Sequence, residues 1–356
     1  MKLFQCQKCG QLLYFENTRC ENCHSPLGFD AHSMDMLTLV AQAEDTFTVF
    51  SHDTVSVRYC QNAEHRACNW LVPLDSTHPF CRACQLNRTI PYLEHENNLA
   101  LWRKLETAKH RLVYSLMRLG LPTQSKFAAP DGGLAFDFLA DQTLASGEVQ
   151  RVMTGHADGI VTINISEADD AQRAQARQSM GERYRTLLGH FRHEVGHYYW
   201  NTLVWNTPYL DAYRQLFGDE RQDYGDALQQ HYERGAPKDW SERYISAYAS
   251  AHPWEDWAET WAHYLHITDT LATAYAFNLH TDPRATDDQS LSADILNDPY
   301  SIGDFDQLYS QWLPLTVAMN SINRSMGQPD LYPFVIPAPV VKKLKYIHTV
   351  CAAAIQ

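Results

Sequence analysis

Three absences narrow what this chain can be. No run of about 18 apolar residues occurs, so the sequence offers no candidate membrane span. The first ten residues, MKLFQCQKCG, lack an apolar core of signal-peptide length, and we therefore expect a cytoplasmic protein. Positive charge is also scarce, because 29 Lys and Arg against 42 Asp and Glu give a net charge of −13. Such a surface repels phosphate backbones and anionic membranes, which argues against a nucleic-acid partner.

Cysteine is nearly missing from most of the chain. Eight of the nine cysteines precede residue 85, and Cys351 stands alone near the C-terminus, where we expect a small core residue. In a reducing compartment, clustered cysteines in CxxC pairs indicate metal sites rather than disulfides. The remaining composition, 356 residues with 45% hydrophobic side chains, is typical of a globular protein of two or three domains.

The first four cysteines form two CxxC pairs, Cys6 with Cys9 and Cys20 with Cys23. Each pair can form a tight knuckle whose two thiolates reach one metal, and two knuckles close a tetrahedral Zn–S4 site. Gly10 directly follows the first pair, where the turn of such a knuckle needs conformational freedom. The pattern predicts a structural zinc on these four cysteines.

A second group of four cysteines is less regular: Cys60, Cys68, Cys81 and Cys84. It contains only one CxxC pair, so the other two thiolates must meet this pair from a hairpin or loop. We expect a second structural zinc here; His65 or His78 could replace one thiolate, and inert buried thiols are the alternative. Basic and aromatic residues nearby are too sparse for a nucleic-acid platform, which argues against a nucleic-acid partner. Ribbons of this kind bind either nucleic acid or protein, and a protein partner of these modules is left open, because the fold alone does not decide.

Arg183–Trp205 is expected to form one helix, and this helix contains the sequence HEVGH at positions 193–197. Residues four apart project from the same face of a helix, so His193 and His197 can bind one Zn²⁺ together. Glu194 then lies beside the metal, where a general base for a zinc-bound water is needed. Because the chain has 17 histidines, a surface helix with two solvated histidines is the alternative.

A catalytic zinc needs a third protein ligand and one open position. The densest candidate is Pro253–Tyr264, which reads PWEDWAETWAHY and begins with a proline suited to the first turn of a helix. Glu255 and Glu259 lie four apart on one face of that helix, among tryptophans. Burying carboxylates among large aromatic side chains is costly without a cation or a hydrogen-bond partner, which favours a metal role for this face.

This segment resembles the arrangement in gluzincins, where a helix carries the ligand glutamate four residues before a second acid. The resemblance implies that Glu255 is the third ligand and that Glu259 accepts a hydrogen bond from a ligand histidine, with the reverse assignment left open. The chain is also similar to lethal-factor-type toxin peptidases, which place a tyrosine seven residues before the ligand glutamate. Tyr248 holds that position, which implies a role in stabilising the oxyanion; a core tyrosine is the alternative.

Nearly the whole chain resembles a bacterial family of zinc-binding metallopeptidases that have an N-terminal zinc-ribbon region and a zincin-like domain. Matching segments include Asn87–Pro91, His193–Trp200 and Trp254–His266. We therefore expect an α+β fold. Two zinc-ribbon modules, about 1–30 and 55–92, would precede a mainly helical metallopeptidase domain, 93–356, with a small edge sheet.

The alternating β-branched run Ile160–Ile165 predicts a strand. At the edge of a sheet, such a strand would bind the backbone of a peptide or protein substrate as an added strand. An ordinary core strand is the alternative.

Together these patterns predict a zinc-dependent peptide-bond hydrolase with one catalytic and two structural zinc ions. Zn²⁺ held by His193, His197 and Glu255 would lower the pKa of its bound water, and Glu194 would take the proton. Three alternatives stay open: an amidase of narrow specificity, a nucleic-acid-associated peptidase, and an inactive scaffold whose ribbons bind a partner.

Overall fold

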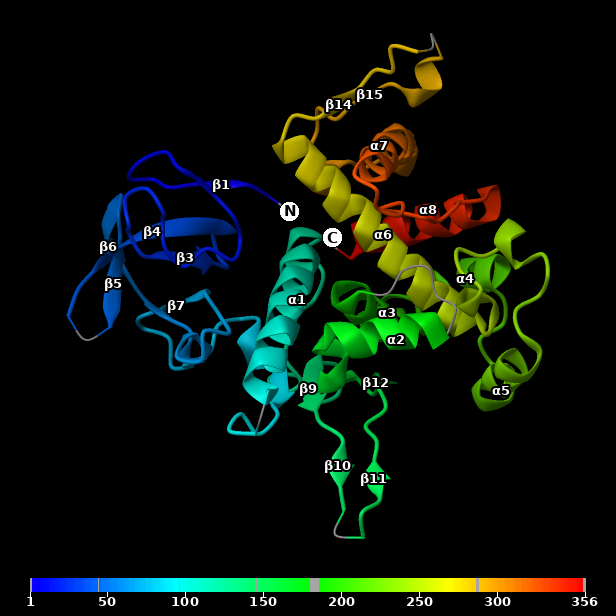
Figure 1. Ribbon diagram of the computed structural model, residues 1–356, viewed down its shortest axis with the longest axis horizontal. Coiled ribbons are helices and arrows are strands. Elements are labelled where there is room, and N and C mark those ends of the chain that lie inside the picture. Colours follow the sequence, from blue (N-terminus) through cyan, green and yellow to red (C-terminus); the bar gives the residue numbers. More distant parts are fainter. Residues whose placement is uncertain are drawn as a thin grey trace. The chain divides into compact units, whose positions relative to one another are not determined.

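The computed structural model describes residues 2–43, 45–95, 97–144, 146–179, 186–285 and 288–354 (Figure 1). The chain divides into two compact units. The first comprises Met1–Val113, Gln124–Gly155 and Ile160–Gln172, and the second comprises Tyr114–Thr123, His156–Gly159 and Arg173–Gln356. Among the described helices, none combines the length and apolar character that a transmembrane span requires.

Short antiparallel strands carry the cysteine-rich part of the first unit. β1 (Phe4–Gln5) pairs with β2 (Leu12–Leu13), and a five-stranded sheet follows in the order β3-β4-β5-β6-β7. Its strands are β3 (Leu27–Asp30), β4 (Asp35–Ala41), β5 (Thr46–Val49), β6 (His52–Tyr59) and β7 (Leu71–Pro73). Phe29 lies in the buried core, 4.9 Å from Phe15 and 4.6 Å from Trp70 between ring centroids. Residues 31–54, between the two predicted modules, thus contribute β4, β5 and the start of β6 to the five-stranded sheet.

A second sheet has the strand order β12-β13-β9-β8. Its strands are β8 (Asn87–Thr89), β9 (Ala135–Leu139), β12 (Gly155–Ala157) and β13 (Ile160–Asn164), and β9 runs parallel to β8 and β13. The strand predicted over 160–165 is therefore present as β13. Its expected place at the sheet edge is wrong, because β12 takes that side. A small hairpin of β10 (Gln142–Thr143) and β11 (Val149–Gln150) lies between β9 and β12 in the chain.

Helices dominate the rest of the chain. They are α1 (Asn98–Arg118), α2 (Asp170–Ser179), α3 (Leu187–Leu203), α4 (Leu210–Phe217), α5 (Tyr224–Arg234), α6 (Pro253–Ala276), α7 (Phe305–Ser325) and α8 (Ala338–Ala353), with a short pair of strands, β14 (His280–Thr281) and β15 (Ala293–Asp294). The predicted α+β class, strand-rich first and mainly helical afterwards, is confirmed.

The helix expected over Arg183–Trp205 is shorter than predicted. It appears as α3, Leu187–Leu203, and residues 183–185 lie outside the described part of the chain. Thr186 caps its first turn, because the hydroxyl accepts a hydrogen bond from the Gly189 N–H at 3.0 Å. At the other end, the turn after Leu203 closes the helix.

Helices α3 and α6 pack directly against each other (Figure 1). Gly196 lies where the two helices meet. A Cβ atom at Gly196 would lie 3.0 Å from the Ala258 Cα atom and 3.2 Å from Trp261. The Trp257 indole donates a hydrogen bond to the Gly196 carbonyl at 2.8 Å, and Tyr199 stacks on Trp261 at 4.9 Å. The glycine within HEVGH thus lets the backbone of α3 approach the acidic face of α6 closely.

Candidate metal centres

Helices α3 and α6 bring three candidate ligands together. His193 and His197 lie one turn apart on α3, and Glu255 lies in the first turn of α6. His193 Nε2 is 3.0 Å from Glu255 Oε2, and His197 Nε2 is 3.6 Å from Glu255 Oε1. All three side chains are buried, and their donor atoms lie within 4.8 Å of one another. Two imidazoles and one carboxylate at this spacing suit Zn²⁺.

The surroundings of the Glu255 carboxylate show whether a cation fits between the three side chains. Its side chain is 1% exposed, and although His193 is near, no donor in the described residues reaches Oε2 in hydrogen-bond geometry. Burial raises the pKa of this carboxyl, but the neighbouring His197 and His193 and a hydrogen bond from Tyr224 lower the pKa to about 2. A buried, ionised carboxylate is costly unless a cation lies beside it. The three side chains therefore fit a zinc ion.

Glu259, one helical turn after Glu255 on α6, has different neighbours. His193 donates from Nδ1 to Glu259 Oε1 at 2.7 Å, and the Ser246 hydroxyl donates to Oε2 at 2.6 Å. Both oxygens of Glu259 are thus engaged by the protein. A carboxylate that accepts the second ring N–H of a ligand histidine fixes the orientation of that ring. The geometry favours Glu255 as ligand and Glu259 as the partner of His193 over the reverse assignment.

Glu194 lies beside these ligands and contacts a histidine that the sequence analysis missed. Its buried carboxylate oxygen Oε1 is 3.2 Å from His190 Nε2, one helical turn earlier on α3. Burial raises the pKa of Glu194, but the hydrogen bond from His190 and the nearby His193 outweigh burial and lower it. Glu194 is therefore available as a carboxylate. The four-residue spacing between positions 190 and 194 was a signal that could have found His190.

Two tyrosines stand beside the same ligands. Tyr248, on a 3-10 turn (Tyr248–Ser250), has its ring 6.1 Å from the His193 ring. Tyr224, at the start of α5, donates a hydrogen bond from its hydroxyl to Glu255 Oε1 at 2.5 Å. Burial raises the pKa of both phenols, so each keeps its proton as a donor. Sequence reasoning missed Tyr224, since only the folded chain brings it to Glu255.

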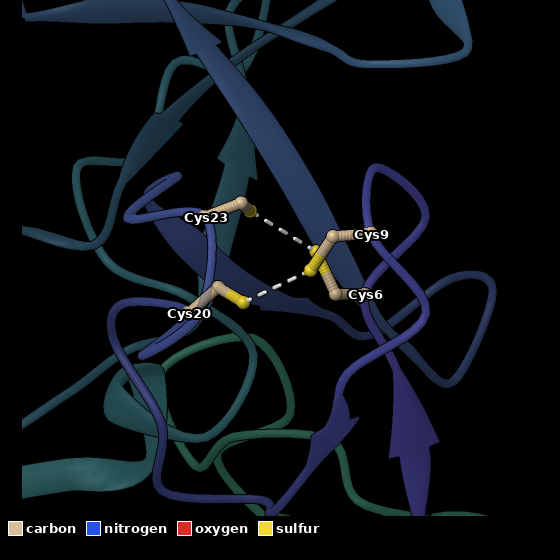
Figure 2. A group of neighbouring side chains, drawn as sticks. All are labelled: Cys6, Cys9, Cys20 and Cys23. Carbon is tan, nitrogen blue, oxygen red and sulfur yellow. Dashed lines mark hydrogen bonds between the residues drawn. The ribbon is translucent and has the colours of Figure 1, made fainter.

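The first cysteine quartet has the predicted arrangement of two facing knuckles (Figure 2). Cys6 Sγ lies 3.6 Å from Cys23 Sγ, and Cys9 Sγ lies 3.5 Å from Cys20 Sγ. Gly10 has a φ of 76°, in the left-handed region that glycine adopts without strain. Cys9 and Cys23 are half-buried, whereas Cys6 and Cys20 are buried. The four sulfur atoms thus converge as a Zn–S4 site requires.

The second cysteine quartet also converges, and all four of its side chains are buried. Cys68 Sγ lies 3.7 Å from Cys81 Sγ. The histidine that reaches these sulfur atoms is His110 of α1, 3.2 Å from Cys68 Sγ. His65 instead packs its ring against Trp102, and neither His65 nor His78 joins a group of metal donors in the described residues. Cys351 is a buried residue of α8, outside both quartets.

Comparison with known proteins identifies the family to which this chain belongs. A family model described as "putative zinc-binding metallo-peptidase" matches residues 98–350, and a zinc-ribbon domain model matches residues 3–95. The chain belongs to this metallopeptidase family. It is 41% identical to uncharacterized proteins of Mycobacterium tuberculosis and Mycobacterium bovis over 351 residues, which cover 98% of this chain and 95% of theirs. No solved structure matches the chain.

This metallopeptidase has two kinds of donor set, one of histidines with a carboxylate and one of four cysteines, and both kinds suit zinc. The metallopeptidase segment, 98–350, contains the His193–His197–Glu255 group, and the zinc-ribbon segment, 3–95, contains the two cysteine quartets. The two models meet between residues 95 and 98, near the predicted domain boundary at 92/93. Residues of α1 as far as Val113 nevertheless belong to the same compact unit as the cysteines.

Proposed function

We propose that this metallopeptidase hydrolyses peptide bonds by the gluzincin-type arrangement. His193, His197 and Glu255 would hold the catalytic zinc, with Glu259 orienting His193. When bound, zinc lowers the pKa of its water towards about 7 and polarises the substrate carbonyl. The observation that carries the proposal is that the two glutamates of α6 have different partners. Glu255 faces both imidazole Nε2 atoms, and Glu259 accepts a hydrogen bond from His193 Nδ1.

In this proposal, Glu194 accepts the proton of the attacking water and delivers it to the leaving amine. His190 holds one oxygen of Glu194 by its 3.2 Å contact, which leaves the other oxygen for the water. Tyr248 donates its hydroxyl proton in a hydrogen bond to the oxyanion of the tetrahedral intermediate. Tyr224 holds Glu255 in place through the hydrogen bond to Oε1.

The substrate we propose is an extended peptide. β12 (Gly155–Ala157), rather than β13, lies at the edge of its sheet. Its residue His156 has its ring 6.2 Å from the His197 ring, in a stacked orientation. An edge strand beside the metal ligands can hold a peptide backbone by adding it as a further strand. In this proposal, β12 takes the substrate-binding role that was predicted for Ile160–Ile165.

Glu194→Gln tests the reaction. The amide cannot accept the proton, so turnover on a peptide library, followed by mass spectrometry, should fall by about 10²–10⁴-fold. Zinc content should stay that of the wild type, because Glu194 is not a ligand. Glu242→Gln, the same change at an exposed position of the same unit, is the matched control and should leave turnover unchanged. Full activity of Glu194→Gln would sink the assignment.

A further inference from the structure

The two histidines that α3 contributes to the candidate zinc site are held in different ways. His193 donates from Nδ1 to Glu259, whereas the Nδ1 atom of His197 is buried and has no acceptor within hydrogen-bond distance in the described residues. A ligand histidine usually donates its second ring N–H, and this hydrogen bond fixes the orientation of the ring. The orientation of the His197 ring therefore depends on the side chains that pack against it.

Besides the neighbouring ligand His193, two rings pack against His197. His156 of β12 stacks on it, with ring centroids 6.2 Å apart and ring planes 18° from parallel. Trp254, the residue before Glu255 on α6, lies edge to face with it at a centroid distance of 4.9 Å. The His197 ring is thus held by one side chain from a strand and by one from the helix that supplies the third ligand.

The turn that follows His156 fixes the position of its ring. The His156 Nε2 atom accepts a hydrogen bond from the Gly159 N–H at 3.0 Å. Asp158 and Gly159 form this turn with φ angles of 47° and 75°, in the left-handed region that the Asp-Gly pair readily adopts. His156–Gly159 belong to the same compact unit as α3 and α6. The turn therefore holds His156, and His156 in turn packs on the metal ligand.

We propose that His156 is a positioning residue of the helical site, which is the group formed by His193, His197 and Glu255. Its ring keeps His197 in the orientation in which Nε2 faces Glu255. A side chain that is already held in place binds a metal without losing rotational freedom at that moment. Strand β12 thereby becomes part of the metal site. This inference rests on the proposed zinc site, and it does not depend on the proposed reaction.

Chelator competition in the full chain tests the proposal. Zinc that the wild type binds and His193→Ala does not bind belongs to the helical site, and this difference gives the affinity of that site. His156→Phe keeps a flat ring, whereas His156→Leu is apolar without one. His156 is half-buried at a sheet edge, so both variants should fold. His280→Leu is the matched control, since it makes the same change at an exposed histidine on β14 of the same unit.

We expect the helical site of His156→Leu to bind zinc about three- to tenfold more weakly than that of the wild type, which corresponds to the loss of one stacked aromatic pair. His156→Phe and His280→Leu should match the wild type. When the helical site alone is reloaded with Co²⁺, its d–d absorption should shift in His156→Leu and stay unchanged in His156→Phe. A loss of stability without a change in the orientation of His197 would not shift this absorption.

Two results would contradict the proposal, and they can be told apart. Equal affinities and equal cobalt spectra of His156→Leu and His156→Phe would overturn the role of His156 while leaving the zinc site in place. Equal zinc content of the wild type and His193→Ala would overturn the proposed helical site itself, and this inference with it.

Discussion

In the helical site, His193 and His197 come from α3 and Glu255 comes from α6, whereas the cysteine sites draw mainly on turns between short strands. Each CxxC knuckle is local, so the chain fixes that pair of thiolates almost by itself. The helical site is assembled only when α3 and α6 pack. The quartets can therefore hold the chain together, whereas the helical site depends on helices α3 and α6 that have already folded and packed.

The two quartets also differ from each other. The first has two half-buried cysteines, and the second is wholly buried and touches His110. A buried Zn–S4 site relies on protein donors where an exposed one can use water. We therefore expect the second quartet to contribute more than the first to the stability of the protein. The substitutions below are given from the largest expected effect to the smallest.

Cys81→Ser should have the largest effect. Structural zinc binding is worth about 10–16 kcal/mol in small zinc modules, more than the stability of a typical domain. Loss of this thiolate should release one zinc ion and unfold the cysteine-rich region, seen as lost solubility and a lowered melting temperature. Cys351→Ser removes a buried thiol outside the quartets and should keep every zinc ion. A Cys81→Ser protein with full zinc content and unchanged melting would break the comparison.

His193→Ala should abolish peptide hydrolysis but leave the protein folded. Zinc content should fall from about three ions per chain to about two, because the quartets keep theirs. Metal analysis and far-ultraviolet circular dichroism measure the two effects. Global unfolding of this variant would show that the helical site is structural, contrary to the contrast drawn above.

Gly196→Ala should weaken the helical site through packing alone. The added Cβ would lie 3.0 Å from the Ala258 Cα atom, so α3 and α6 must move apart. We expect a loss of about 1–3 kcal/mol in the free energy of unfolding, measured by denaturant titration, together with weaker zinc binding. Gly225→Ala on α5, where a Cβ meets only an ordinary contact at 3.5 Å, is the control. Equal stability of both variants would contradict the close approach.

Tyr224→Phe should have the smallest effect on structure. Removing the hydrogen bond to Glu255 Oε1 should lower the affinity of the helical site for zinc by about ten- to a hundredfold. Chelator competition measures this affinity. Tyr232→Phe, on the exposed side of the same helix, should bind zinc like the wild type, and equal affinity of the two variants would remove Tyr224 from the site.

Local patterns predicted a large part of this protein. The CxxC pairs and the HEVGH sequence predicted donors that the structure also groups, because a turn or a helical turn fixes the distance between residues three or four positions apart. The expected partner of the zinc ribbons and the domain boundary at 92/93 stay predictions. The edge position of Ile160–Ile165 was wrong, since strand order is set by pairing along the whole sheet.

What the sequence determined by itself is the type and local spacing of the donors: two cysteine quartets, a pair of histidines with an adjacent glutamate, and two acids four residues apart. Only the tertiary structure gave Glu255 and Glu259 different neighbours, brought Tyr224 to Glu255 and placed His110, instead of His65 or His78, against the second quartet. The physical reason is that these contacts join residues 26–66 positions apart. Their meeting depends on which helix faces pack together, and no local spacing encodes that.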